Sequence, residues 1–322
     1  MKTIAGPILA VTSIGDPYTD PENRSMIDRE QTKQKLRKHL HALTVVIGER
    51  SVRLPDNLEK TAAYIKKFYR DIDVAFHCQN YVYSDLPMEN IVVEISSSAR
   101  PKHRLLVGAH SDSVAGTVGA DDNASAIAVQ LELARQLTTL VVEEKLDLAV
   151  KLVSFALEEP PVYGTRHMGS RVYAKTARRQ KEMLDGMICL EMVGYACHEP
   201  GCQGYPFPLR FMNYPDKGNF IGIVNNFKSR KFAREMAAQF QKNKQLPAVR
   251  LTVPLNGWVL PAVRLSDHAS FWDQGYKAVM LTDSAFFRNP HYHTAADTMD
   301  RLDFEFMAEL VESLLMFFRS FR

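Results

Sequence analysis

The sequence predicts an α/β protein, a three-layer α/β/α sandwich around a central, mostly parallel, mixed sheet. From residue 104 onward, short apolar runs typical of buried strands alternate with helical segments. Such alternation places helices on both faces of a largely parallel sheet. The 322 residues contain no internal repeat and no low-complexity linker. We therefore expect one domain over residues 1–322, with helices and edge strands in 25–100 and a core in 104–322.

The segment before the core is expected to be helical first and extended afterwards. Residues 26–48 and 57–69 predict two helices, and residues 74–95 predict an edge hairpin or meander. We expect its turn at residues 86–90, where a proline and an asparagine interrupt the apolar pattern.

The core is expected to continue as regularly alternating elements. Strands are predicted at 104–109, 148–157, 186–193, 220–224, 248–253 and 278–282, and helices at 124–137, 165–180, 229–241, 268–274 and 299–321. The first of these helices carries Ile127, Leu131 and Ala134 at helical spacing. Residues 198–218 begin with five prolines and glycines in eleven positions, which indicates an insertion loop.

Composition argues against two classes of partner. The formal net charge is only +3, and no basic block is interleaved with aromatic residues, so no nucleic acid is expected. No apolar run approaches the roughly 20 residues of a membrane span, so no membrane partner is expected either. Residues 1–15 only faintly resemble a signal peptide, because Gly6-Pro7 breaks a weak apolar centre. We expect a cytoplasmic protein.

The four cysteines form neither a disulfide framework nor a zinc-finger spacing. Cys189 lies inside an apolar run and is expected in the core. Cys197 and Cys202 flank a Pro-Gly turn and could pair in an oxidising compartment. We expect them to be free thiols.

Ionisable side chains stand at the ends of successive predicted strands. They are His110, Asp112, the pair Asp121-Asp122, the pair Glu158-Glu159, Glu191 and His293. The carboxyl ends of parallel strands meet at one edge of a sheet, where such folds place their sites. Imidazoles and carboxylates are ligands suited to zinc or a neighbouring divalent metal. Each residue alone has an ordinary structural explanation, but several buried acids in one cleft require a cation.

Seven segments resemble peptidase family M28, a family of zinc aminopeptidases. They occur in the family's order over residues 104–300, whereas the first hundred residues match only loosely. The segments are Val107 to Ser113, Gly119 to Ser125, Glu158-Glu159, Gly169-Ser170, Leu190 to Met192, Ser266 to His268 and Tyr292 to Thr298.

The resemblance implies the zinc-dependent exopeptidase fold and a centre of two zinc ions. The implied ligands are His110 and Glu191 for one zinc, Glu159 and His293 for the other, and Asp122 as a bridge. The peptide after the bridging aspartate is often cis in this family.

Two further roles follow from the same resemblance. Asp112 is expected to orient the His110 ring from behind. Glu158 is expected to be the general base, which takes a proton from water and returns it to the leaving amine.

The sequence departs from the family at two positions. Many members have aspartate at the position of Glu191, and some have an oxyanion-binding tyrosine where this chain has Val263. Arg264 is therefore a candidate for oxyanion binding or for gripping a substrate carboxylate. Met192 and Tyr292 match positions that line the family's substrate pocket, so we expect them beside an apolar pocket.

The resulting hypothesis is a metal-dependent exopeptidase that removes N-terminal residues from peptides. Three alternatives stay open: a carboxypeptidase, a glutaminyl cyclase on a related fold with one zinc, and a catalytically silent relative that serves as a binding module. Oligomeric state is not readable from the sequence.

Overall fold

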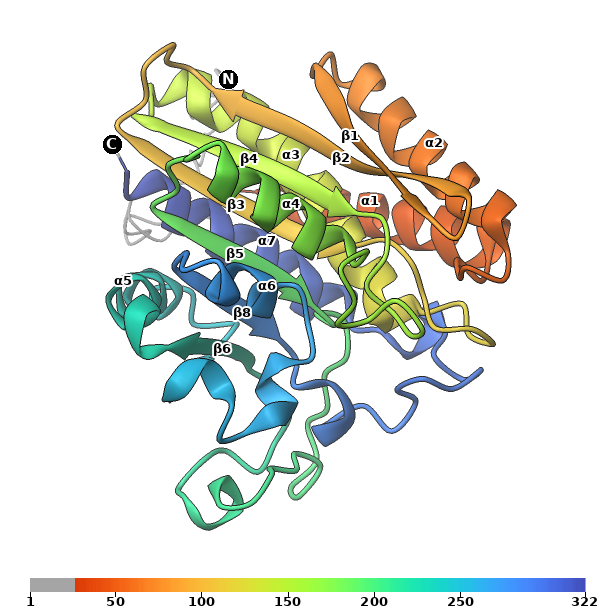
Figure 1. Cartoon of the computed structure of the whole chain (residues 1–322). Helices are drawn as coiled ribbons and strands as arrows, with labels where there is room; N and C mark the ends of the chain where they lie inside the picture. The colour runs from red at the N-terminus through yellow and green to blue at the C-terminus, as the bar shows by residue number, and fades with distance from the viewer. Residues whose placement is uncertain (1–26, 322) are drawn as a thin grey trace, which may run out of the picture.

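An eight-stranded mixed sheet runs through the molecule (Figure 1). This computed structural model describes residues 27–321, and the order of its strands is β1-β2-β4-β3-β5-β8-β6-β7. Their bounds are β1 Phe76–Tyr83, β2 Leu86–Ser96, β3 His103–His110, β4 Leu148–Phe155, β5 Gly186–Glu191, β6 Ile221–Asn226, β7 Ala248–Val253 and β8 Ala278–Thr282.

The four central strands, β4, β3, β5 and β8, are parallel. β2 pairs antiparallel with β4 at one side, and β6 pairs antiparallel with β8 at the other. β3 and β5 are buried along nearly their whole length, which explains their continuous apolar sequences. The parallel centre gathers four strand ends at one edge of the sheet.

Helices cover both faces of the sheet, as the sequence predicts. One apolar core packs α1 (Arg29–His41), α2 (Pro55–Asp71), α3 (Ala126–Glu143), α5 (Arg230–Phe240) and α7 (Phe304–Arg319) on one face. A second packs α4 (Gly169–Arg179) and α6 (His268–Asp273) on the other. Figure 1 shows α4 and α6 in front of the sheet and α3 and α7 behind it. The three-layer α/β/α prediction is confirmed.

Several predicted boundaries are corrected. The turn between β1 and β2 lies at Ser84 and Asp85, which both have positive φ, and not at residues 86–90. Pro87 is tolerated inside β2 because β4 pairs with β2 only from Ile91 onward, so the start of β2 has one free edge. The last helix begins at Phe304 and not at residue 299, because the side chain of Asp303 caps it.

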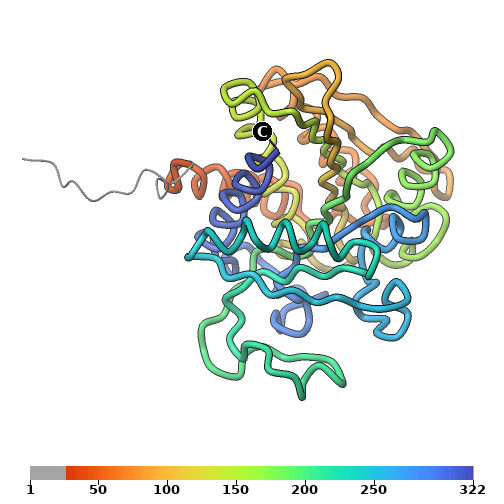
Figure 2. Tube along the Cα trace, turned by 90° about the vertical axis from the view of Figure 1, so that its left-hand side faces the viewer, coloured from red at the N-terminus to blue at the C-terminus, as the bar shows by residue number. Residues whose placement is uncertain are grey.

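The insertion, residues 198–218 in the sequence, projects from the sheet edge at the bottom of the molecule (Figure 2). Its two ends meet, because the N–H of Cys197 donates to the carbonyl of Gly218 at 2.9 Å. Cys197 and Cys202 form a disulfide across a separation of five residues, so the expectation of free thiols is wrong. The spacing alone could not show this, whereas the folded turn brings the two Cα atoms to 6.4 Å.

Among residues 27–321, no helix is long and apolar enough to cross a lipid bilayer. The signal-peptide question and the start of the first predicted helix concern residues 1–26, which lie outside the described part of the chain.

Candidate metal centre

The predicted ligands converge at the carboxyl edge of the parallel strands. His110 is the last residue of β3 and Glu191 the last of β5, while Glu159 follows β4 by four residues. Asp122 lies in the segment that enters α3, and His293 lies in the loop after β8. Residues separated by up to 183 positions are thus brought together because parallel strands end side by side.

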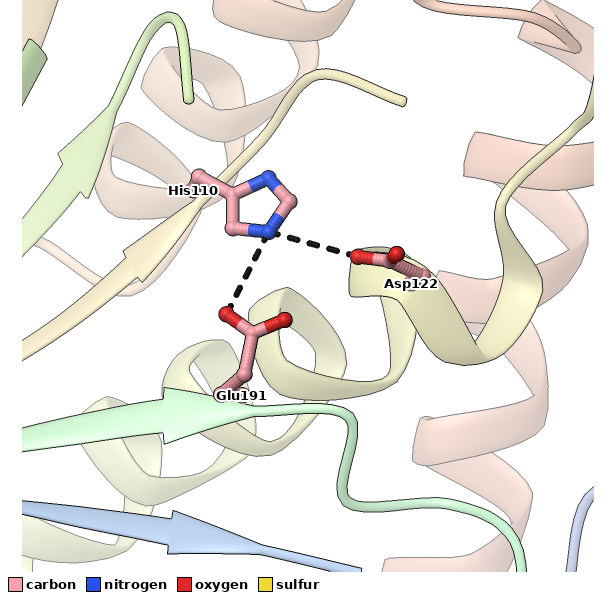
Figure 3. A group of neighbouring side chains, drawn as sticks. All are labelled: His110, Asp122 and Glu191. Carbon is pink, nitrogen blue, oxygen red and sulfur yellow. Dashed lines mark ion pairs between the residues drawn. The ribbon is translucent and has the colours of Figure 1, made fainter. Parts of the chain in front are cut away.

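Asp122 lies between the two histidines. Its Oδ1 is 3.4 Å from Nε2 of His110, and its Oδ2 is 3.1 Å from Nε2 of His293. Oε2 of Glu191 is 3.4 Å from the same His110 nitrogen. Figure 3 shows both carboxylates facing this nitrogen. Oε2 of Glu159 is 3.3 Å from the His293 nitrogen. One carboxylate therefore joins two groups of three potential ligands, with one histidine in each.

The donor atoms point at one another without ordinary hydrogen-bond partners. Nε2 of His110, Nε2 of His293 and Oε1 of Glu159 are buried and have no hydrogen-bond partner among the described residues. Buried polar atoms rarely stay unpaired. Two imidazole nitrogens aimed at carboxylates fit divalent metal ions, and this mixture of nitrogen and oxygen donors suits zinc.

The charges of the cleft point to the same conclusion. Burial raises the pKa of Glu159 to about 8, and the nearby Asp122 carboxylate adds to the shift. Burial lowers the pKa of His293, but the adjacent Asp122 and Glu159 carboxylates outweigh it and raise the pKa to about 10. The cleft thus crowds carboxylates around two histidines, and a divalent cation would balance their negative charge.

Asp112 organises the site from behind the ligands. Its Oδ1 lies 3.1 Å from Nδ1 of His110, which leaves Nε2 facing Asp122 and Glu191. The same carboxylate accepts the backbone N–H groups of Glu158 and Glu159 at 3.0 to 3.1 Å. One buried side chain thereby fixes a ring orientation and the loop after β4.

Glu158 forms a third candidate group with His110 and Glu159, but it belongs to neither of the two groups that contain Asp122. Its carboxylate is buried, and one of its oxygens lies within 4.8 Å of ligand atoms of His110 and Glu159. Burial raises its pKa well above the ordinary value; His110 opposes this shift, and the Glu159 and Glu191 carboxylates add to it. A buried acid of raised pKa is suited to proton transfer.

A comparison with models of protein families shows to which family the chain belongs. The model of peptidase family M28 matches residues 90–318. The chain belongs to peptidase family M28.

Two curated sequences illustrate the range of relatives of this M28 chain. YfbL of Escherichia coli K12, an uncharacterized protein, is 35% identical over 295 residues, which are 89% of this chain and 88% of YfbL. A probable leucine aminopeptidase of Trichophyton verrucosum is 26% identical over 225 residues, which are 66% of this chain and 53% of that protein. The chain therefore spans most of YfbL but about half of the fungal relative.

Solved structures share the M28 fold at low sequence identity. The LapA aminopeptidase of Legionella pneumophila superposes with a TM-score of 0.68 and 18% identity, over 97% of this chain and 76% of LapA. The glutaminyl cyclase of Porphyromonas gingivalis superposes with a TM-score of 0.63 and 16% identity, over 92% of this chain and 99% of the cyclase. At such identities the likeness concerns the fold alone.

Other residues of the M28 site were not given a role from the sequence. Asp297 accepts the N–H of Asp121 at 2.9 Å and that of Asp122 at 3.1 Å, which holds the bridging segment in place. Ser266 donates to Oε2 of Glu191 at 2.6 Å. Both lie inside the segments that resemble the family, so membership in a motif was their only signal. The peptide bond between Asp122 and Asn123 is cis, as the resemblance implies.

An apolar cavity of about 110 Å³ opens beside the metal centre. Glu191 and Tyr292 line it next to the ligands, β6 and β7 line one wall, and the insertion lines another with Tyr205, Leu209 and Tyr214. Of the three predicted pocket residues, only Tyr292 lines this cavity, and its ring stacks on that of His293 at 3.8 Å.

The other two predicted pocket residues lie elsewhere. Met192 is fully buried behind the centre, where its N–H donates to Asn123. Arg264 is buried, and its guanidinium donates to both carboxylate oxygens of Asp273 and to the carbonyl of Asn256. The sequence could not reveal that Arg264 forms an ion pair with Asp273, nine residues later.

Proposed function

We propose that this protein is a zinc aminopeptidase that uses two metal ions. The observation that carries the proposal is the position of Asp122, whose two oxygens face two different histidines. His110 and Glu191 would hold one ion, His293 and Glu159 the other, and Asp122 both. Zinc bound there would polarise the scissile carbonyl and lower the pKa of the attacking water.

The protein's own residues supply the remaining chemistry. Glu158 would take the proton of the attacking water and deliver it to the nitrogen of the leaving peptide. Asp112 supports this role because it accepts the Glu158 N–H and so sets where that carboxylate lies. The raised pKa of Glu158, which comes chiefly from burial, favours uptake of the proton.

Charge favours release from the amino end of a peptide. Glu191 lines the cavity, and Glu158 lies among the candidate metal groups, so these carboxylates would attract a free ammonium group. A carboxypeptidase needs a cation for the terminal carboxylate, and Arg264, the residue predicted for that role, is paired with Asp273. The apolar cavity beside Glu191 would take an uncharged side chain, because an unpaired charge is costly to bury there.

A glutaminyl cyclase is the second candidate, since a solved cyclase superposes over nearly its whole length. The two histidine-containing groups joined by Asp122 favour two ions and hence the peptidase.

The test combines metal analysis with a substrate panel. We expect two zinc ions per chain, hydrolysis of aminoacyl p-nitroanilides, and no hydrolysis once the amino group is acetylated. One zinc ion with cyclisation of N-terminal glutamine would establish the cyclase instead. Cleavage only of N-acetylated peptides with a free carboxylate would establish a carboxypeptidase.

A further inference from the structure

Arg50 is a completely buried arginine that lies outside the segment matched by the M28 model. Its guanidinium donates five hydrogen bonds, all to backbone carbonyls. The acceptors are Leu43 at 3.3 Å, Gly48 at 3.1 Å, Val118 at 2.6 Å, Ser111 at 2.9 Å and Gly119 at 3.0 Å. Within residues 27–321, these five hydrogen bonds include no carboxylate acceptor.

Three of these acceptors belong to one segment of the site. Ser111 directly follows His110, and Val118 and Gly119 precede Asp122 by four and three residues. The backbone of Arg50 adds two bonds to the same segment, because its N–H donates to Oγ of Ser113 and its carbonyl accepts the N–H of Ser113. Arg50 therefore contacts both ends of the loop that separates His110 from Asp122.

Asp297 complements Arg50 on the next residues of that loop. Arg50 satisfies the carbonyls of Val118 and Gly119, and Asp297 satisfies the N–H groups of Asp121 and Asp122. The turn between them is tight: Gly119 has φ of +52°, and a Cβ there would lie 2.1 Å from the carbonyl oxygen of Asp122. The backbone is thus held by a cation on one side and an acid on the other.

The hydrogen bonds of Arg50 compensate the free-energy cost of burying its charged guanidinium. Burial lowers the pKa of Arg50 to about 10, against the opposing pull of Asp112 and Asp297, so the group stays charged at neutral pH. A buried charge is tolerated only when hydrogen bonds satisfy it. Lysine cannot reproduce the arrangement, since only the planar fork of arginine reaches several carbonyls at once.

We propose that Arg50 is a positioning residue of the metal centre, which fixes the His110–Asp122 loop before any metal binds. The proposal rests on the proposed metal site. Through the Arg50 side chain, the N-terminal segment would help to hold Asp122 in place.

The test compares Arg50→Met and Arg50→Lys with the matched control Arg53→Met, whose arginine is exposed three residues away. The first readout is hydrogen–deuterium exchange of the metal-free protein. We expect exchange in residues 111–122 to become about tenfold faster or more in both Arg50 variants, with central strands β3 and β5 unchanged. The second readout is zinc affinity, which should weaken by about 10- to 100-fold. The control should match the wild type in both readouts.

Specific outcomes overturn the proposal. If a folded Arg50 variant exchanges like the wild type in residues 111–122, or exchanges faster to the same extent throughout the protein, Arg50 does not position the loop. Arg50→Lys keeps the charge and provides the answer if Arg50→Met does not fold. If the wild type binds no divalent metal, the proposed function fails, while the exchange experiment still decides whether Arg50 orders the loop.

Discussion

The carboxylate of Asp112 accepts the backbone N–H of Glu158 through both of its oxygens, each at 3.0 Å. This contact joins the loop after β4 to the strand end that carries His110, whose Nδ1 the same carboxylate holds. The proposed base and one proposed ligand are therefore placed by a single buried acid, and a change in that acid should disturb both.

Asp112→Asn should weaken zinc binding by about 10- to 100-fold and lower kcat as well. The amide has one accepting oxygen where the carboxylate has two, so it cannot serve His110 and both N–H groups. Isothermal titration with zinc and steady-state kinetics measure the two effects. Asp216→Asn, an exposed acid in the insertion, is the control. Wild-type affinity in Asp112→Asn would contradict the role.

Glu158→Gln should lower kcat by about 100- to 10,000-fold and leave the zinc content unchanged. The substitution keeps the size of the side chain and removes its capacity to accept a proton. Stopped assays on an aminoacyl anilide, together with metal analysis of the same sample, separate the two properties. Glu199→Gln changes an exposed acid of the insertion and should be silent. Loss of metal in Glu158→Gln would make Glu158 a ligand and refute its role as the base.

His293→Ala should reduce the zinc content from two ions to one per chain. His293 is the only histidine in its group of potential ligands, whereas His110 belongs to the other two groups. His291→Ala is the matched control, because His291 lies in the same loop and is in no candidate metal group of the described chain. Plasma emission analysis of dialysed protein gives the count, and two ions in both variants would reject this ligand set.

Thiol titration should find two free cysteines in the unreduced, unfolded protein and four after reduction. Cys78 and Cys189 are free, and Cys197 and Cys202 are paired. Closing so short a loop stabilises the folded state by about 2 kcal/mol in the chain-entropy model. Cys202→Ser should therefore loosen the insertion and raise KM for substrates with large apolar side chains. Four reactive thiols without reductant would show that the bond does not form.

Acid should destabilise the protein partly through His39. Burial lowers the pKa of His39 from 6.5 to about 3, and its Nδ1 lies 2.7 Å from the Tyr64 hydroxyl. Between these two pKa values the unfolded chain binds a proton that the folded protein does not. The free energy of unfolding therefore falls by about 1.4 kcal/mol for each pH unit below 6.5.

His39→Gln should reduce the slope of the free energy of unfolding against pH by about 1.4 kcal/mol per pH unit, which corresponds to one proton. Urea unfolding at several pH values measures this slope. His41→Gln, which changes an exposed histidine on the same helix, should retain the wild-type slope. Identical slopes in all three proteins would contradict the assignment to His39.

Periodicity and strand ends allowed much of the fold to be predicted. β7 and β8 begin and end where their apolar runs do: Pro247 and Pro254 flank β7, and the charged Lys277 and Asp283 flank β8. The hairpin turn was misplaced because Pro87 suggests a break, and only the register of β2 against β4 shows why a proline is tolerated. Whether a proline is tolerated in a strand depends on which strand pairs beside it, and the local sequence does not show that pairing.

The predicted ligands follow strands directly, and for that reason the sequence indicates them. The residues that hold these ligands in place do not follow strands, so the strand pattern does not indicate them. Asp297 acts through backbone N–H groups, and Arg50 bonds carbonyls that lie up to 69 residues away. Such contacts depend on how loops fold back, which no local spacing encodes.

The insertion leaves the sheet after β5 and returns at β6, whose first residues lie beside the end of β8 because these two strands are antiparallel. Its ends, Cys197 and Gly218, are already hydrogen-bonded to each other. We therefore expect that most of residues 198–217 can be exchanged without a change in strand register, provided that Gln203 and Gly204 keep their bonds to the loop after β8. If the cavity receives the substrate side chain as proposed, a library built at this one junction would change which side chain is accepted and leave the proposed ligands and Glu158 untouched.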